Sequence, residues 1–342
     1  MKAMILKSIT DIDLNSEPLI MSDMPDPVPG DDEVLVKVAA CGICHTELDE
    51  IEGRTPPRQF PVIPGHQVIG KVAAAGKNVT ELKPGDRIGV AWIFSSCGKC
   101  SFCLGGYENL CPEFRATGRD ANGGYAEYMN VPAAFTYKIP EIFTDSQAAP
   151  LLCAGAVGYR AVKLTGLQDG QNIGLTGFGA SGHLMLQIIK HSFPDTRIFV
   201  FARSEAERTF ALELGAYWAG DTTGYIPEQL DYIIDTTPVW KTVVEALKNL
   251  KPGGRLVINA IRKEEIDREY LLNIDYSRHL WMEKEIKSVA NVTRADVKEF
   301  LEIASEIPII PEVQEYKLGE ANIALTELKK RKIRGAKVLV LS

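Results

Sequence analysis

The stretch NIGLTGFGASGHLMLQIIKHS, residues 172–192, decides the fold of this chain. It reads as a short apolar strand, a glycine-rich turn and an apolar helix that begins near Ser181. Gly177, Gly179 and Gly182 form the pattern G-x-G-x-x-G at the turn. The first glycine permits a tight turn, the second lets a ligand approach the backbone, and the third lets helix and strand pack closely. Because a helix N-terminus stabilises an anion, the stretch predicts a dinucleotide site, and a glycine turn without a ligand is the alternative.

The segments that follow repeat the order of strand, turn and helix. They are RIFVFARSEAERTFALELGA (197–216), LDYIIDTT (230–237) and GGRLVINA (253–260). Strands that alternate with helices in this way are typical of a doubly wound parallel sheet. The sequence therefore predicts an α/β fold for the part of the chain between about residue 151 and residue 286.

The residues after the second strand bear on which nicotinamide cofactor would bind. An NAD site usually carries Asp or Glu about 20 residues after the glycine turn, where it binds the ribose hydroxyls. Here the strand RIFVF is followed by Ala202, Arg203 and Ser204. Arg203 and Ser204 could bind a 2′-phosphate, so we expect NADP(H), with Ala180 and the three glycines at the pyrophosphate. An Arg203 that only stacks on adenine would admit NAD(H) as well, and Glu205 keeps that alternative open.

A second diagnostic stretch, SCGKCSFCLGGYENLCP, covers residues 96–112. Its four cysteines are Cys97, Cys100, Cys103 and Cys111. The close spacing of the first three lets a tight loop turn their thiolates inward, and the fourth then completes a tetrahedral shell. Four thiolates with no open position describe a structural zinc site. An iron–sulfur cluster would need a shorter last gap, and a disulfide pair or free thiols are the remaining alternatives.

Three further candidate ligands come from separate segments: Cys44 in CGICHTELD, His66 in PGHQVIG and Cys153 in PLLCAG. Two thiolates and one imidazole leave a fourth tetrahedral position for water or substrate, which distinguishes a catalytic zinc site from a closed one. Taken singly, Cys153 reads as a buried core cysteine and His66 as a turn histidine. Their occurrence beside the dinucleotide site and the cysteine cluster indicates a catalytic metal, so we expect two zinc ions per chain.

Composition limits the class of protein. A length of 342 residues exceeds what one hydrophobic core usually supports, so two domains are expected. With 45% hydrophobic and 24% charged residues the chain is neither disordered nor membrane-spanning. The net charge of −7 argues against a nucleic-acid partner. The N-terminus lacks the features of a signal peptide, and metal ligation in a reducing compartment accounts for the seven cysteines better than disulfides do, so we expect a cytoplasmic protein.

Taken together, these motifs resemble those of zinc-dependent alcohol dehydrogenases of the medium-chain dehydrogenase/reductase superfamily, over the whole chain. The matching pieces are GICHTELD, PGHQVIGKVAAAGKNV, KPGDRIG, the Cys97–Cys111 lobe, LLCAG and GFGASG. The resemblance is greatest to the shorter microbial tetrameric enzymes, typified by the yeast enzyme. It implies a mostly β GroES-like catalytic domain at residues 1–151 and 287–342, a structural zinc lobe at about 95–113, and a Rossmann domain at 152–286. It also implies a homotetramer, with a dimer as the alternative.

The resemblance assigns roles to individual residues around the metal. Cys44, His66 and Cys153 match the catalytic zinc ligands, and this Cys2His set is the one that alcohol dehydrogenases use. Thr46 matches the hydroxyl that takes the substrate proton, and His45 matches a residue near the cofactor phosphates. The four clustered cysteines match the structural zinc ligands.

Two more residues are assigned in the same way. Glu47 matches a carboxylate that orients the zinc histidine, with a solvated loop acid as the alternative. Trp92 lies where the family places an aromatic wall of the substrate pocket, with a core tryptophan as the alternative.

Two positions depart from the family pattern. Gln67 stands where the family has a glutamate near the zinc, so any step in which that carboxylate approaches the metal is in doubt. Asp49 replaces the outer histidine of the proton relay. We hypothesise that Asp49 passes the proton to solvent, the alternative being an exposed Asp49 with water in its place. Cys41 has no assigned partner and is expected to pack in the core.

The expected function is an NAD(P)-dependent alcohol dehydrogenase or aldehyde reductase. It would transfer hydride between a primary aliphatic or benzylic alcohol and a nicotinamide cofactor, with zinc as Lewis acid. A polyol or secondary-alcohol dehydrogenase is the alternative, although the polyol branch more often has a carboxylate where Cys153 stands; a non-catalytic cofactor-binding protein is a remote one. Trp92 is present but residues 54–57 offer no second tryptophan, so we expect a pocket wider than ethanol needs.

Overall fold

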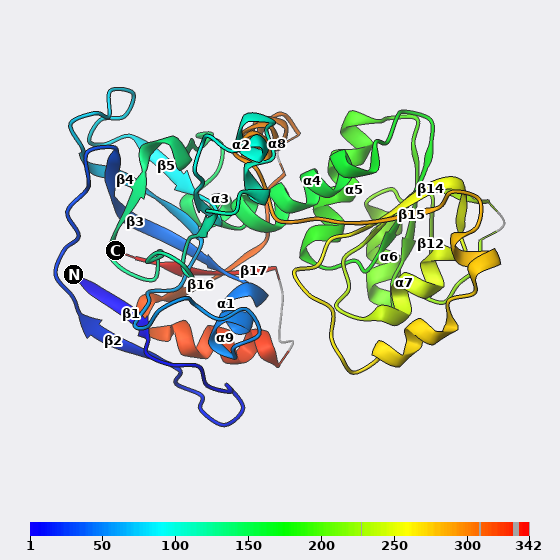
Figure 1. Ribbon diagram of the computed structural model, residues 1–342, viewed down its shortest axis with the longest axis horizontal. Coiled ribbons are helices and arrows are strands. Elements are labelled where there is room, and N and C mark those ends of the chain that lie inside the picture. Colours follow the sequence, from blue (N-terminus) through cyan, green and yellow to red (C-terminus); the bar gives the residue numbers. More distant parts are fainter. Residues whose placement is uncertain (227, 308, 331–334, 342) are drawn as a thin grey trace. The chain divides into compact units, whose positions relative to one another are not determined.

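The computed structural model describes residues 1–226, 228–307, 309–330 and 335–341, apart from the side chain of Ala180. The chain forms two compact units (Figure 1). The first unit comprises Met1–Cys153 and Val292–Ser342, and the second comprises Ala154–Asn291. The boundary expected after residue 286 would fall inside strand β15 (Glu285–Ser288), which pairs with a strand of the second unit and therefore belongs to it.

The second unit is built on a six-stranded parallel sheet with the order β12-β11-β10-β13-β14-β15. Besides β15, the sheet contains β10 (Asn172–Thr176), β11 (Arg197–Phe201), β12 (Trp218–Gly220), β13 (Leu230–Asp235) and β14 (Leu250–Ile258). In chain order this is 3-2-1-4-5-6, the arrangement of a Rossmann domain, which confirms the predicted fold class. The order reverses beside β10, so the carboxyl end of that strand is the topological switch point where ligands bind.

Helices cover both faces of this sheet: α4 (Ala156–Thr165), α5 (Ala180–Ser192), α6 (Glu205–Glu213) and α7 (Trp240–Leu247). Successive strand residues alternate between two apolar cores, as the period of two in a strand requires. Ile233 packs in one core with Val243 and Leu247 of α7, and Ile234 packs in the other with Met185 of α5. The sheet is therefore buried on both sides, which explains its nearly continuous apolar strands.

The first unit contains a seven-stranded, mostly antiparallel sheet with the order β16-β17-β3-β4-β5-β9, to which β8 adds by pairing with β3. The strands are β3 (Glu33–Ile43), β4 (Gln67–Ala75), β5 (Arg87–Val90), β8 (Tyr128–Pro132), β9 (Thr136–Lys138), β16 (Val313–Lys317) and β17 (Ala336–Val340). The last strand, β17, returns from the end of the chain to pair antiparallel with β3. This is the GroES-like domain that the resemblance implied.

Within its described residues, the first unit also has two smaller strand pairs and five α-helices. The pairs are β1 (Lys2–Leu6) with β2 (Leu19–Asp23), and β6 (Ile93–Ser95) with β7 (Arg115–Ala116). The helices are α1 (His45–Ile51), α2 (Ser101–Leu104), α3 (Asp145–Pro150), α8 (Arg294–Glu306) and α9 (Ala321–Lys329). Over the part of the chain that the structure describes, no helix is both long and apolar enough to span a bilayer.

Candidate active site and metal centres

Cys44, His66 and Cys153 come together in the first unit although they are far apart in the chain. Antiparallel pairing sets Gly42 of β3 opposite Gln67 of β4, so Cys44 just after β3 lies beside His66 just before β4. The Cys44 Sγ lies 3.6 Å from the His66 Nε2, which lies 3.3 Å from the Cys153 Sγ. Metal–ligand bonds of about 2.0–2.3 Å in a tetrahedron place ligand atoms roughly 3.3–3.8 Å apart. The donor types and their spacing therefore fit zinc.

Cys153 occupies an unusual backbone conformation. Helix α3 runs directly into a π-helical turn, η3 (Leu151–Gly155), and then into α4. Single π-helical turns are rare and occur mostly at functional sites. Cys153 lies in the middle of this turn, and its Sγ lies 3.3 Å from the His66 Nε2.

Glu47 orients the imidazole ring of His66. Its Oε1 lies 2.6 Å from the His66 Nδ1, and both side chains are almost completely buried. Its Oε2 accepts a hydrogen bond of 2.8 Å from the backbone N–H of Cys44, as part of the capping box that begins α1. With Nδ1 held by the carboxylate, Nε2 is left to a metal, which is the usual arrangement around zinc histidines.

Without a metal ion, Cys44 and His66 hold their protons tightly, and these protons compete with zinc for the ligand atoms. The pKa of the Cys44 thiol lies well above its usual value because the thiol hydrogen-bonds to the Cys153 side chain and is buried. Burial alone would lower the pKa of His66, but the Glu47 carboxylate and the Cys44 sulfur outweigh it and hold the pKa well above its usual range. Zinc must displace these protons, so its binding releases them and depends on pH.

The four clustered cysteines form a second group of sulfur atoms that lie within 4.8 Å of one another. The Cys103 Sγ is 3.6 Å from that of Cys100 and 3.9 Å from that of Cys97, which fits the edges of a tetrahedral zinc–thiolate site. Backbone N–H groups of Lys99 and Cys100 lower the pKa of Cys97 to about 6. Burial raises the pKa of Cys111 to about 11, so the fourth ligand would ionise only with a cation bound.

Arg294 ties this cysteine lobe to the rest of its unit, a contact that the sequence did not suggest. Glu108 lies between Cys103 and Cys111, in the 3-10 helix η1 (Glu108–Leu110). Its buried carboxylate accepts hydrogen bonds from the backbone N–H of Arg294, at 2.7 Å, and from the Nη2, at 2.8 Å. The two residues are 186 positions apart, so no local pattern could have paired them.

Thr46, His45 and Asp49 all lie on α1. Thr46 is half-buried in the first turn of the helix, and His45 is exposed. Asp49 is buried, and its Oδ1 lies 2.5 Å from the Nε of Arg54. The alternative of an exposed Asp49 is therefore wrong, while its part in a proton relay stays a prediction. The sequence did not predict the contact of Arg54 with Asp49, because an arginine that follows a glycine usually indicates an exposed turn.

Two residues near the ligands have packing roles in the structure. The Gln67 side chain lies against Gly42, where a Cβ would stand only 2.5 Å from the Gln67 Oε1. Cys41 is completely buried in the core, and its sulfur would be 2.8 Å from a Cβ at Gly65. Residue 65 must therefore be glycine, both for this approach and for its φ of +99°.

Trp92 lies between β5 and β6 and is half-buried. Its ring centroid is 5.3 Å from that of Phe114. The guanidinium of Arg119 lies over the indole ring, 5.0 Å from its centroid. The indole is thus enclosed by aromatic and cationic side chains, and its place at the substrate stays a prediction.

In the second unit, the glycine turn has the geometry that dinucleotide binding needs. Gly177 follows β10 with a φ of +84°, and a Cβ there would stand 2.7 Å from the Thr236 Oγ1. A Cβ at Gly182 would stand 2.8 Å from the Gly177 carbonyl oxygen, so the third glycine permits close packing of helix and turn. A Cβ at Gly179 would have no described atom within 4 Å, which is the open side that a pyrophosphate could approach. Ala180 begins α5, and its side chain lies outside the described part.

After β11, the Ser204 hydroxyl that was expected to bind a 2′-phosphate is bonded within the protein. Ser204 is the N-cap of α6: its hydroxyl accepts a hydrogen bond from the Glu207 N–H and donates one of 2.9 Å to the Glu207 Oε2. Arg203 is exposed. Arg208, which the sequence did not single out, donates from Nη1 to the carbonyl oxygens of Ala202 and Arg203, at 2.9 and 2.8 Å. A second arginine is therefore fixed at the end of this strand.

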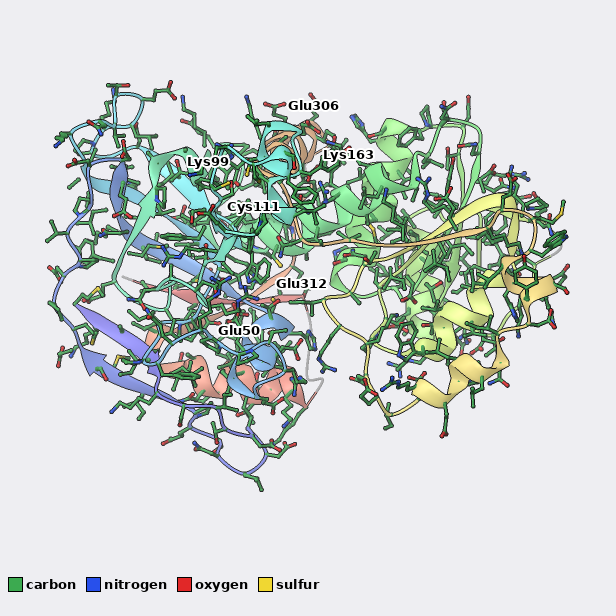
Figure 2. The ribbon with its side chains drawn as sticks, in the orientation of Figure 1. Glu50, Lys99, Cys111, Lys163, Glu306 and Glu312 are labelled. Carbon is green, nitrogen blue, oxygen red and sulfur yellow. The ribbon has the colours of Figure 1, made fainter. Side chains whose placement is uncertain are left out.

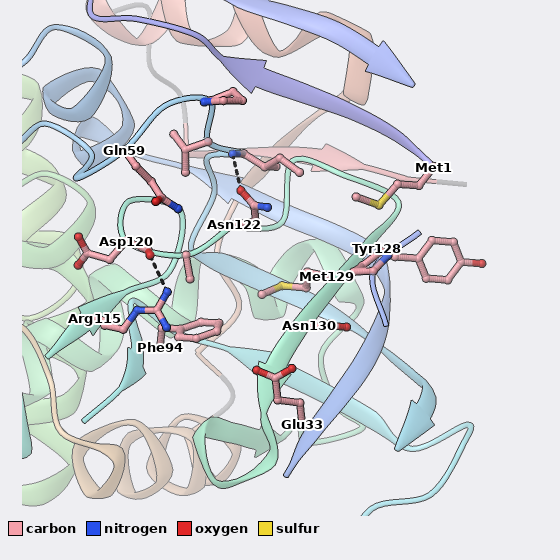
Figure 3. A pocket seen from close by; sticks show the side chains of 15 residues that line it. Met1, Glu33, Gln59, Phe94, Arg115, Asp120, Asn122, Tyr128, Met129 and Asn130 are labelled. Atoms are coloured by element: carbon pink, nitrogen blue, oxygen red, sulfur yellow. Dashed lines mark hydrogen bonds between the residues drawn. The ribbon is translucent and has the colours of Figure 1, made fainter. Parts of the chain in front are cut away.

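A separate cavity of about 310 Å³ lies in the first unit (Figure 3). Polar side chains such as Glu33, Gln59 and Asn122 line it together with the apolar Phe94 and Met129. None of the sequence-predicted site residues lines it. The structure therefore gives it no part in the metal chemistry.

These features define a zinc-dependent oxidoreductase that uses a nicotinamide dinucleotide. Residues 30–141 match the alcohol dehydrogenase GroES-like domain. The "Probable alcohol dehydrogenase AdhA" of Mycobacterium tuberculosis (strain CDC 1551 / Oshkosh) is 42% identical over 327 residues, which are 94% of this chain and 92% of that protein. The chain belongs to the zinc-dependent alcohol dehydrogenases of the medium-chain dehydrogenase/reductase superfamily, and is an NAD(P)-dependent oxidoreductase.

Two further similarities agree with this assignment. An alcohol dehydrogenase of Geobacillus stearothermophilus is 34% identical over 90% of this chain and 91% of that protein. The solved structure of a cinnamyl alcohol dehydrogenase of Sorghum bicolor has a TM-score of 0.82 and 26% identity, covering 99% of this chain and 97% of that one.

Proposed function

We propose that this enzyme interconverts primary aliphatic or benzylic alcohols and their aldehydes. The observation that carries the proposal is the cluster of Cys44, His66 and Cys153, whose donor atoms all lie within 4.8 Å of one another. Such a Cys2His set leaves one tetrahedral position for the substrate oxygen. When bound, zinc supplies a Lewis acid that lowers the pKa of the substrate hydroxyl. The four-cysteine cluster would hold a second, structural zinc.

The residues of α1 would remove the substrate proton. Thr46 would accept it at its hydroxyl and release the hydroxyl's own proton toward Asp49, which lies three residues further on, on the same face of the helix. Asp49 would pass the proton toward solvent, and its contact with Arg54 fixes the position of its carboxylate. His45, exposed at the start of α1, would contact the cofactor phosphates.

Trp92 would form one wall of the substrate pocket, and its contacts with Phe114 and Arg119 support a fixed ring. Residues 54–57 are Arg-Thr-Pro-Pro, so that segment adds no second tryptophan. A benzyl group would therefore be accepted as well as a short alkyl chain.

The coenzyme domain supports NADP(H) as the preferred cofactor. Arg203 is exposed after β11, and Arg208 is held beside it by two backbone carbonyl groups. Two guanidinium groups and no carboxylate directly after the strand suit a 2′-phosphate. Ser204 would contribute through the start of α6 and not through a free hydroxyl, because its hydroxyl is bonded to Glu207.

We further propose a homotetramer in the cytoplasm. Strand β15 ends the six-stranded sheet, and all four of its residues are exposed. Ile286 on this strand, and Trp281 and Met282 just before it, are large apolar side chains that are about half exposed. An edge strand beside exposed apolar groups favours pairing with a second copy. Light scattering during size-exclusion chromatography would separate a tetramer from a dimer.

The activity is tested by the initial rate of benzaldehyde reduction with NADPH and with NADH at equal concentrations. The expected result is a rate that disappears on chelation and returns with zinc, and that is higher with NADPH. Cys153→Ser, which removes one ligand sulfur, is the matched inactive variant. A rate that survives both chelation and this substitution would contradict the zinc mechanism, and a higher rate with NADH would contradict the cofactor assignment.

A further inference from the structure

Glu50 is a buried acid on α1 that the proposed chemistry does not use. It lies three residues after Glu47, where Figure 2 labels it. Its side chain is 1% exposed. Neither of its carboxyl oxygens has a hydrogen-bond partner among the described residues. Burying a carboxyl group without partners is costly, and nearly all buried polar groups in proteins are satisfied. We therefore expect a hydrogen-bond donor close to the Glu50 carboxyl group.

That partner is the indole N–H of Trp92. The Trp92 Nε1 is itself buried and makes no complete hydrogen bond within the described part of the chain. The indole N–H nevertheless acts on the Glu50 carboxyl group as a side-chain donor. Within the described part of the chain both groups are buried without another hydrogen-bond partner, so the indole N–H is the donor available to this carboxyl group.

Arg119 holds the indole ring at its face. Its guanidinium lies 5.0 Å from the centroid of the Trp92 ring. It is held there by the almost fully buried carboxylate of Asp120, to which its Nη2 donates at 2.8 Å. Asp120 is itself fixed: its Oδ1 lies 3.0 Å from the Nε of Arg58, and its carbonyl oxygen accepts from Arg115 at 2.8 Å (Figure 3).

We propose that Glu50 is a positioning residue for substrate selection, which together with Arg119 fixes the Trp92 indole in one orientation. Glu50 anchors the N–H edge of the ring, and Arg119 covers its face. A ring held at edge and face keeps one rotamer, so the width of the pocket beside it stays constant. The inference rests on the proposed place of Trp92 at the substrate.

The state of Glu50 near neutral pH agrees with this role. Burial, with the nearby Glu47 carboxylate, raises the pKa of Glu50 to about 8, against the opposing effects of His66, Trp92 and Arg119. The side chain is then largely protonated and still presents a carbonyl oxygen to the indole N–H. Glutamine has the same shape and keeps that oxygen, which makes Glu50→Gln the matched control. Leucine at this position removes the acceptor at similar size.

The test compares Glu50→Leu with Glu50→Gln in two measurements. The first is the ratio of kcat/KM for benzyl alcohol to kcat/KM for ethanol, with KM and kcat resolved for each. The second is the 19F resonance of Trp92 in protein labelled with 5-fluorotryptophan, identified by its loss in Trp92→Phe. We expect Glu50→Leu to change the ratio about fivefold to tenfold, mainly through KM, and to shift the resonance, while Glu50→Gln stays within about twofold of the parent. Zinc content must be equal in all variants.

Opposite results would overturn the proposal. An unchanged resonance in Glu50→Leu would show that Glu50 does not hold the indole, and equal effects of Gln and Leu would show that the acceptor oxygen is not the cause. A shifted resonance with an unchanged ratio would show that Trp92 is not at the substrate. If Glu50→Leu does not fold, Arg119→Met replaces it, with Arg119→Lys as its control. The resonance tests the positioning even if the parent enzyme turns over neither alcohol, which would refute the proposed substrates alone.

Discussion

Replacing Arg294 with methionine is expected to loosen the cysteine lobe. The Arg294 side chain is 41% exposed and that of Glu108 is 8% exposed, so the substitution leaves a buried carboxylate without its cation. The backbone N–H of Arg294 still donates to Glu108, but the side-chain donors at Nε and Nη2 are lost. A fully buried pair would cost about 3–5 kcal/mol to break. Because the guanidinium is partly in water, we reduce this to about 2–3 kcal/mol of unfolding free energy.

The assay measures both stability and zinc retention. Denaturant unfolding gives the free energy, and a chromophoric chelator follows zinc release, which should be faster because the lobe is no longer tied to α8. Arg294→Lys keeps the charge without the two-pronged donor and should lose about half as much. Arg268→Met is the control for an exposed pair: Arg268 and Glu265 are 70% and 76% exposed, so breaking their contact should cost about 0–0.5 kcal/mol. If Arg294→Met matches that control in both measurements, the reasoning is refuted.

Three other perturbations follow from the contacts of individual residues. Glu47→Gln should weaken zinc binding at His66 about 10-fold to 100-fold, measured by competition with a chelator, because the carboxylate that orients the ring is lost; an unchanged affinity would remove that role. Glu50 has a folded-state pKa of about 8, raised from an ordinary value of 4.5, so the folded state holds its proton more tightly. The stability from this group is complete below about pH 4.5 and is lost as the pH rises through 8; between pH 5 and pH 9 the zinc-free parent should lose about 2–4 kcal/mol of unfolding free energy relative to Glu50→Gln, and parallel pH curves would contradict this. Arg203→Ala should raise the KM for NADPH about 10-fold with little change for NADH in steady-state kinetics, whereas equal effects on both cofactors would show that Arg203 does not bind a 2′-phosphate.

Residues close together in the chain carried most of the prediction. The four cysteines lie within 15 positions, and the three glycines lie within six. Over such distances the allowed backbone conformations restrict where side chains can point, so spacing alone indicates a tetrahedral thiolate site or a phosphate-binding turn. The alternation of apolar strands and helices likewise predicted the doubly wound sheet, because each buried face needs a matching period.

Contacts between distant segments were decided by the tertiary structure. Cys153 lies 87 positions from His66, and spacing could not have joined them without the family resemblance. The partners of Glu108, Asp49 and Glu50 were not foreseen at all, because a single charged residue carries no signal about which distant group will face it. Chain entropy allows many such pairings, and only the packing of the sheet and the helices selects one. The sequence by itself thus determined the two kinds of site and the fold of the coenzyme domain, whereas the tertiary structure alone decided which buried charges support them.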